Sequence, residues 1–457
     1  MRSLNSKATC LFVAALATVL ASYAPVLAGD RGWSDGVARQ FRASGLAPGA
    51  GRSYLQPLRL KQQSVTLDRS SAVLDDGVVA EALALGTDLR LAAGAAQPDR
   101  VAAPLFFLGS REPGPAMLHE LQGKVVVMID RDAAAMDPAS RMALERSGAV
   151  GFLTVPSAPA AAAEAPAQDA VYLADEAAAP LTATVGAEAA ARLFARSGRD
   201  YAHIVALVRA GRTVPSFALD LNLKASLTIQ TRSAASANVV GVVRGTDPLL
   251  AREYVVISAD ASAAGSVLDA ARRFHDAAMR PKRSVVFAVF APEQHGAPGA
   301  RAFAARPPVP REDVVASLSA TVASAAADAT LAIQGGEETS LGASARDLAA
   351  GARLSVASTA PTVGGGQAPY RLLEAGIPAV LLSFGGAGAD GGYLLALALQ
   401  VADNDAHPAW VRGSRFAPRA PQAQEMLTVP VEMPLGRRRQ KALDVLARSD
   451  VPEPRLR

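Results

Sequence analysis

The second half of the chain alternates short, almost wholly apolar segments with amphipathic ones. Residues 254–260 (YVVISAD) and 284–291 (SVVFAVFA) are such apolar segments, a pattern typical of strands that are buried on both faces of a sheet. Between them, residues 266–278 place apolar side chains at helical spacing. Strands that alternate with helices predict an α/β fold with a mixed, mostly parallel sheet and helices on both of its faces.

The first half has a different pattern. Residues 32–49 have helical spacing and end in glycine and proline, and residues 53–67 are extended. Three segments then predict strand, strand, helix and strand, at residues 103–110, 121–132 and 142–155. We therefore expect an inserted, β-rich domain. The predicted organisation is residues 1–28 as a signal peptide, 29–97 with 231–412 as a discontinuous main domain, 98–230 as the insert, and 413–457 as a C-terminal tail.

The N-terminus has the pattern of an export signal. Arg2 and Lys7 precede an apolar run that is short for a membrane span, and Ala28 ends a small-residue cleavage site before Gly29. We therefore expect a periplasmic or secreted protein. The alternative is an uncleaved anchor. Beyond this signal, no stretch of about 18 apolar residues free of charges and helix breakers predicts a membrane span.

Composition narrows the function classes. Of the 457 residues, half are apolar and 19% are charged, with a net charge of +4. The basic residues form no stripe interleaved with aromatic ones, which argues against a nucleic-acid partner. Cys10 is the only cysteine and lies in the expected signal. The mature chain would therefore contain no disulfide, no thiol nucleophile and no cysteine-ligated zinc.

Three segments, in a fixed order, carry a family resemblance. Residues 123–155, 238–259 and 281–303 are similar to the insert, the metal-bearing strand and the base-bearing strand of the di-zinc aminopeptidases (glutamate carboxypeptidase and aminopeptidase S-like) that contain a protease-associated domain. The resemblance extends over residues 32–410. It implies a three-layer zinc-aminopeptidase-like sandwich with a protease-associated insert. It also implies that two zinc ions activate a shared water and that a carboxylate accepts its proton.

When the family's metal ligands are matched to this sequence one by one, the resemblance implies a degenerate metal site, in which other residue types occupy the ligand positions. The expected histidine and its neighbouring aspartate are Asp260 and Ser262, and the later aspartate is Thr321. The expected pair of glutamates is Glu293 and Gln294, which keeps the base position and loses the ligand. Zinc prefers histidine, cysteine and carboxylate ligands, so amide and hydroxyl replacements are poor substitutes.

Two loops that the resemblance would supply are also short. The loop for the bridging aspartate is missing, because Gly265 leads directly into a helix. The loop for the last histidine is reduced to residues 386–392 (GAGADGG). We therefore expect no bound zinc, with Asp260 serving as a strand-end cap and Glu293 as a relic of the general base. The alternatives are that Glu293 is a working base, or that both carboxylates hold a hard cation.

The five histidines do not rebuild a metal site by spacing, since none forms the short helical pair of a zinc protease. They are His119, His203, His275, His295 and His407. Only His295 follows the expected base, either as a loop residue or as a substitute ligand or acid beside Glu293. We expect a non-catalytic protein that binds a peptide or an envelope protein. The alternatives are a metallo-aminopeptidase or carboxypeptidase with an altered site, and a structural partner of an intact paralogue.

Overall fold

The computed structural model describes residues 32–92, 95–110, 112–131, 136, 138–157, 169–176, 179–276, 278–291, 297–323, 330–352, 354–357, 368–385 and 391–418. The expected signal peptide and nearly all of the expected tail lie outside these ranges, and so do Glu293, Gln294 and His295.

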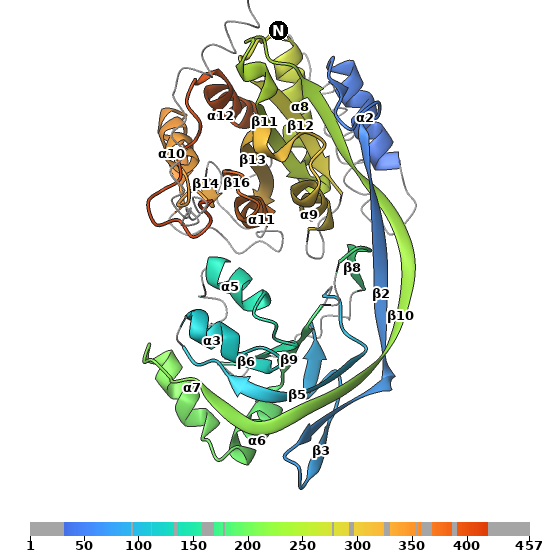
Figure 1. Cartoon of the computed structure of the whole chain (residues 1–457), viewed down its shortest axis with the longest axis vertical. Coiled ribbons are helices and arrows are strands. Elements are labelled where there is room, and N and C mark those ends of the chain that lie inside the picture. The colour runs from blue at the N-terminus through green and yellow to red at the C-terminus, as the bar shows by residue number, and fades with distance from the viewer. Residues whose placement is uncertain are drawn as a thin grey trace, which may run out of the picture. The chain divides into compact units, whose positions relative to one another are not determined.

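The main domain is built on the predicted mixed sheet, with strand order β15-β14-β16-β13-β11-β12-β10 (Figure 1). Strands β11, β12, β13 and β16 are parallel to one another. β10 runs antiparallel to β12, and β14 runs antiparallel to β16 but parallel to β15. The bounds are β10 (Phe217–Val243), β11 (Tyr254–Asp260), β12 (Ser284–Phe290), β13 (Val314–Ala323), β14 (Thr330–Gln334), β15 (Ser355–Val356) and β16 (Ala379–Gly385). The α/β fold class predicted from the sequence is therefore confirmed.

Helices cover both faces of this sheet. Val255 and Ile257 of β11 pack in one hydrophobic cluster with α2 (Gly32–Ala43), α8 (Ala264–Asp276), α10 (Leu341–Gly351) and α12 (Gly391–Asp403). Val256, between them, packs on the other face with α9 (Pro298–Ala305) and α11 (Ala368–Glu374). Successive strand residues point to opposite faces, which explains why an unbroken apolar run serves both clusters.

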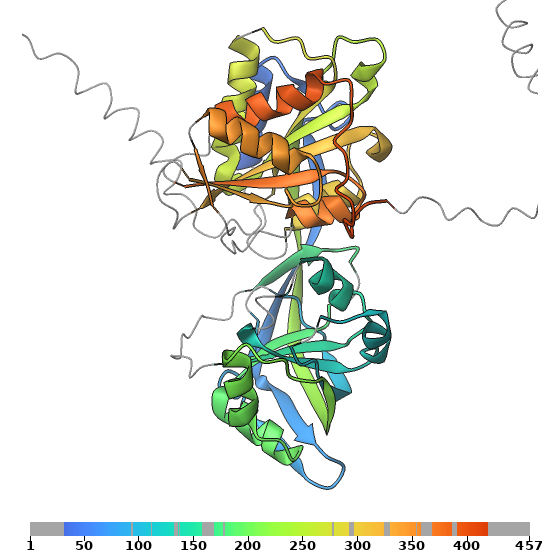
Figure 2. The same cartoon turned by 90° about the vertical axis from the view of Figure 1, so that its left-hand side faces the viewer.

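Two long strands join the main domain to the insert. β2 (Leu55–Asp75) and β10 pair antiparallel from Leu55 opposite Val239 to Asp75 opposite Asn222, and they lie side by side in both views (Figures 1 and 2). The short strands that pair with them are β1 (Ala47–Pro48), β3 (Ala80–Leu83) and β8 (Ala170–Leu173). The predicted boundary between residues 230 and 231 thus falls inside a continuous strand.

The insert continues the same hydrogen-bonded sheet, because β5 (Arg100–Phe107) pairs antiparallel with β10. β5, β6 (Val125–Ile129), β7 (Gly151–Val155) and β9 (Leu181–Val185) are parallel to one another, with β4 (Leu89–Leu91) antiparallel at the edge. Helices α6 (Ala187–Arg196) and α7 (Tyr201–Arg209) cover one face, and α3 (Pro115–Glu120) and α5 (Pro138–Glu145) contribute to the other. The insert therefore combines the expected strands with four described helices. Alanine-rich sequence such as AEAAARLFAR favours helix because alanine has the highest helix propensity.

Residues from before the insert complete its core. Leu74, Leu83 and Leu89 lie in the same hydrophobic cluster as Phe107 and Phe194. By sequence these three leucines belong to residues 29–97, which we assigned to the main domain. Packing therefore joins the distal half of β2 and the hairpin after it to the insert.

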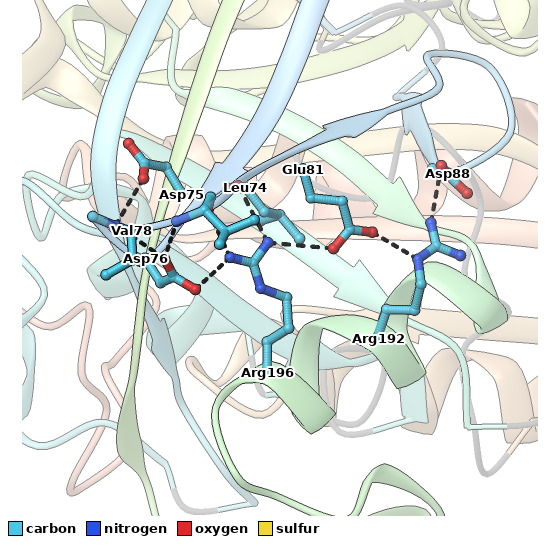
Figure 3. Close-up of polar contacts among 10 residues, drawn as sticks. Leu74, Asp75, Asp76, Val78, Glu81, Asp88, Arg192 and Arg196 are labelled. Atoms are coloured by element: carbon cyan, nitrogen blue, oxygen red, sulfur yellow. Dashed lines mark hydrogen bonds and ion pairs between the residues drawn. The ribbon is translucent and has the colours of Figure 1, made fainter.

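Charged residues attach that hairpin to α6. Arg196 contacts Asp76 (Nη2 to Oδ2, 2.6 Å) and Glu81 (Nη1 to Oε2, 3.3 Å), while Arg192 contacts Glu81 at 2.8 Å and Asp88 at 3.1 Å (Figure 3). The pKa of Asp76 lies well below its usual value. The main cause is a hydrogen bond from the backbone N–H of Val79, and the second is the hydrogen bond from Arg196. This cluster of acids and arginines has a structural explanation and is not a candidate catalytic site.

No helix in the described part of the chain combines the length and the hydropathy that crossing a bilayer requires.

Candidate functional site

The carboxyl ends of β11, β12, β13 and β16 meet at one edge of the sheet because these strands are parallel. In open α/β sheets this is the edge at which ligands bind. Asp260 ends β11 there, and Thr321 lies near the end of β13. The segments that follow the other ends, 292–296, 324–329 and 386–390, lie outside the described residues. The structure therefore places two of the four predicted site residues, and Glu293 and Gln294 stay predictions.

Asp260 is engaged in capping. Its Oδ1 accepts hydrogen bonds from the backbone N–H of Ser262 (2.7 Å) and of Ala263 (3.0 Å), and from the Ser262 hydroxyl. These contacts cap a short 3-10 turn (Ala261–Ala263), after which α8 begins at Ala264. The strand-end cap expected from the sequence is confirmed, and so is the short connection between strand and helix.

Small hydroxyl side chains occupy the neighbouring positions. Ser258 of β11 pairs in register with Ser319 of β13, and their hydroxyl oxygens are 2.8 Å apart. Thr321 pairs in register with Ser383 of β16, and both are buried. Ser383 Oγ has no hydrogen-bond partner among the described residues. This part of the sheet is therefore buried, polar and uncharged.

These donors can be compared with what a pair of zinc ions needs. Zinc takes imidazole nitrogen, thiolate or carboxylate oxygen, usually four ligands to each ion. Asp260 offers one carboxylate, whose Oδ1 already accepts three hydrogen bonds, and its described neighbours are neutral hydroxyls. Within the described ranges, no group of three or more His, Cys, Asp or Glu side chains is placed to hold a metal ion. The described donor set does not fit two zinc ions.

Asn238 is a site residue that the sequence reasoning missed. It is fully buried in β10, its Oδ1 accepts from the backbone N–H of Ala291 (3.0 Å), and its Nδ2 donates to Gly299 O (3.0 Å) and Gln56 Oε1 (2.8 Å). Ala291 and Gly299 flank segment 292–296, which contains Glu293. The signal in the sequence was a single amide in the apolar run ANVVGVV.

The far end of that segment has an unusual backbone. Ala297 has φ of 52° and caps α9 in the left-handed conformation, which costs a non-glycine residue roughly 1 kcal/mol. A Cβ at Gly299 would come within 2.8 Å of Ala291 N, so only glycine permits this approach. Strain of this kind persists where surrounding contacts enforce it, often at ligand sites.

The four described histidines are dispersed. His119, His203 and His275 lie in α3, α7 and α8. His407 Nε2 is 3.0 Å from Glu253 Oε1, at the amino edge of the sheet. None of the four joins Asp260.

Ser34 lies in a short sequence that resembles a serine-hydrolase motif. Residues Gly32–Gly36 match the G-x-S-x-G pattern of serine hydrolases, but Ser34 is buried in the first turn of α2. A nucleophile elbow exposes its serine on a sharp turn between strand and helix. The motif is therefore coincidental.

Comparison with known proteins supports the resemblance in part. Residues 238–410 match the family model of Peptidase family M28. The chain thus contains an M28 peptidase-like segment. That segment includes β11, β12, β13 and β16 and does not reach the insert, whose protease-associated character stays a prediction. No curated protein matches the chain.

Similar solved structures include the aminopeptidase from Aneurinibacillus sp. strain AM-1, at 14% identity over 82% of this chain and 88% of that one, with a TM-score of 0.43. A peptidase M28 precursor from Shewanella amazonensis SB2B is 15% identical over 83% and 89%, with a TM-score of 0.40. BSAP, a zinc aminopeptidase from Bacillus subtilis, is 14% identical over 82% and 89%, with a TM-score of 0.38. At these scores the likenesses carry no argument about chemistry.

Proposed function

We propose that this protein is an exported, non-catalytic member of the M28 peptidase-like fold that binds a peptide or a protein of the cell envelope. The observation that carries the proposal is the chemistry at the carboxyl edge of the sheet. Asp260 caps a turn there, and Ser258, Ser319, Thr321 and Ser383 supply only hydroxyls. Neutral residues avoid the repulsion that packed carboxylates would feel without cations.

Retention of the fold without the ligands favours binding over catalysis. The edge is still framed by parallel strands, and Asn238 still holds both flanks of segment 292–296. An extended peptide at such an edge could be bound without cleavage. If the insert is a protease-associated domain, it would provide a second surface to which the partner binds.

A metallo-aminopeptidase or carboxypeptidase with an altered site is the second candidate, and the family match over residues 238–410 favours it. In that case Glu293 would act as general base, and Asp260 would contribute a metal ligand. The two proposals differ in what happens to zinc and to a bound peptide.

The deciding experiment combines elemental analysis with a peptide screen. The mature protein is purified without chelator, assayed for zinc, and incubated with a peptide library with and without added zinc. We expect less than stoichiometric zinc and peptides recovered at unchanged mass. Two zinc ions per chain, together with a hydrolysis that Glu293→Gln abolishes, would establish the second candidate.

Asp260→Ser separates the two roles of that residue. Serine is a good helix N-cap, so stability should change by less than about 0.5 kcal/mol, whereas the carboxylate is lost. We expect peptide binding to be unaffected, with Asp260→Ala as the control that also removes the cap. N-terminal sequencing of the exported protein tests cleavage before Gly29.

A further inference from the structure

A large pocket is lined by a different set of residues. Its volume is about 900 Å³, which is within the usual range for small-molecule sites. The start of β2, the turn after β8, the ends of α9 and α11 and Arg311 form its walls. None of the edge residues described above lines it.

Arginines dominate the charged lining. Five guanidinium groups face three carboxylates, and the lining residues concerned are Arg59, Arg301, Arg306, Arg311, Arg371, Asp175, Glu176 and Glu374. The half-buried groups are paired, with Arg301 2.7 Å from Glu176 and Arg371 3.4 Å from Glu374. Burial raises the pKa of Glu176, although Arg301 opposes the change. The deeper part of the pocket is therefore close to neutral.

The excess of positive charge lies at the rim. Arg59 and Arg306 share a single carboxylate, that of Asp175, at 3.1 Å and 3.0 Å. Arg311 donates to the backbone carbonyl of Ala305 (2.8 Å) and forms no ion pair with a described residue. Three guanidinium groups thus face one carboxylate, and Arg59 and Arg306 are exposed to an approaching ligand, with side chains 78% and 75% accessible.

The rim is attached to rigid elements. The Gln56 side chain donates to the backbone carbonyl of Arg306 (2.8 Å) and accepts from buried Asn238 (2.8 Å). Leu58 and Ala302, both buried, form an apolar wall beside it. The backbone at Arg306 is therefore held in place, and a planar guanidinium loses less freedom per hydrogen bond formed than a flexible ammonium would.

We propose that this pocket binds a small polyanion with carboxylate or phosphate groups, and that Arg59, Arg306 and Arg311 contact its oxygens. Guanidinium groups form bidentate, charge-assisted hydrogen bonds with both kinds of oxygen. The apolar wall contacts the carbon frame of the ligand. This inference does not rest on the proposed function, because the pocket shares no residue with the carboxyl edge.

The test uses calorimetric titration of the full mature chain with citrate and, separately, with pyrophosphate at low ionic strength. We expect at least one to bind more tightly than about 1 mM, and the stronger one identifies the preferred oxygen chemistry. The double variant Arg306→Gln/Arg311→Gln, called the pocket pair, should weaken that binding at least about tenfold. Arg232→Gln/Arg346→Gln, which removes two exposed arginines outside the pocket, should leave it within about twofold.

Asp175→Asn gives a change of opposite sign. It removes the carboxylate that competes for Arg59 and Arg306, so binding should strengthen severalfold. Thermal unfolding of each variant establishes that it is folded. The proposal is wrong if neither anion binds, if the control pair loses as much affinity as the pocket pair, or if Asp175→Asn weakens binding.

Discussion

The two edges of the main sheet are built from different chemistry. At the amino edge, Arg283 is fully buried, and its Nε donates to Glu253 (2.6 Å). Its other nitrogens donate to backbone carbonyls at the end of α12, those of Val401 (3.1 Å), Asn404 and Asp405 (3.1 Å). At the carboxyl edge the described interior side chains are hydroxyls and one amide. Of the two edges, the amino edge thus contains the buried ion pair, whereas Asp260 is the one charged group described above for the carboxyl edge.

The contrast between the two edges has a structural reason. The amino edge needs its arginine because unpaired carbonyls at a helix end are costly to bury. The carboxyl edge has no such structural demand for charge. The serine and threonine residues there pair in register with their neighbours.

The largest expected effect is at the amino edge. Arg283→Met would leave Glu253 without its buried partner and several carbonyls without donors, which should cost about 3–5 kcal/mol of unfolding free energy. Lys282→Met is the control, because its ion pair with Asp405 is exposed and contributes less than about 1 kcal/mol. Urea denaturation measures both. Equal losses would mean that the amino edge is not a special stabilising region.

Next in size is Asn238→Ala, which should cost about 1–3 kcal/mol because the buried N–H of Ala291 and carbonyl of Gly299 lose their partner. Asn222→Ala, in the same strand with one long bond of 3.5 Å, should cost less than half as much. The comparison by chemical denaturation tests whether this amide braces the carboxyl edge. A similar cost for both would contradict that role.

The hydroxyls of the carboxyl edge provide a smaller contrast. Ser319→Ala would leave the buried hydroxyl of Ser258 unpaired and should cost about 1 kcal/mol. Ser383→Ala removes a buried hydroxyl that has no partner among the described residues, so it should be neutral or stabilising. Thermal unfolding distinguishes the two. A clear loss in Ser383→Ala would indicate a partner in the neighbouring loops.

The smallest effect concerns acid stability. Burial raises the pKa of Glu253, but hydrogen bonds from Arg283 and His407 outweigh it and lower the pKa below its ordinary value of 4.5. Because the folded pKa is the lower one, this contribution to stability is present above pH 4.5 and is lost as the pH falls through the folded pKa. Glu253→Gln should therefore flatten the acid limb of a stability profile. An unchanged slope below pH 4.5 would mean that the pair contributes nothing.

Much of the main domain could be predicted because its signals are local and periodic. Residues 285–290 are apolar throughout, and they lie in a strand whose residues are all buried. The helix predicted over residues 266–278 forms as α8. The capping role of Asp260 could also be predicted, since a carboxylate two or three residues before free backbone N–H groups is the usual N-cap arrangement.

Other features depend on residues far apart in the chain. Asn238 forms hydrogen bonds with Gln56, Ala291 and Gly299. These partners are far from it in the sequence, so the residues around Asn238 do not indicate them. Arg283 lies between an apolar strand and a loop, where an arginine is ordinarily exposed. The rim of the arginine pocket brings together residues 59, 175, 306 and 311 from four separate segments.

The amino-acid sequence by itself determined the α/β class and the order of the elements of the main domain, because periodicity and residue type are properties of short segments. Only the tertiary structure decided which charges are buried and paired, which amide braces the edge of the sheet, and where arginines outnumber their carboxylate partners. Those properties depend on distances between remote residues, which the packing of strands and helices sets and the local pattern does not encode.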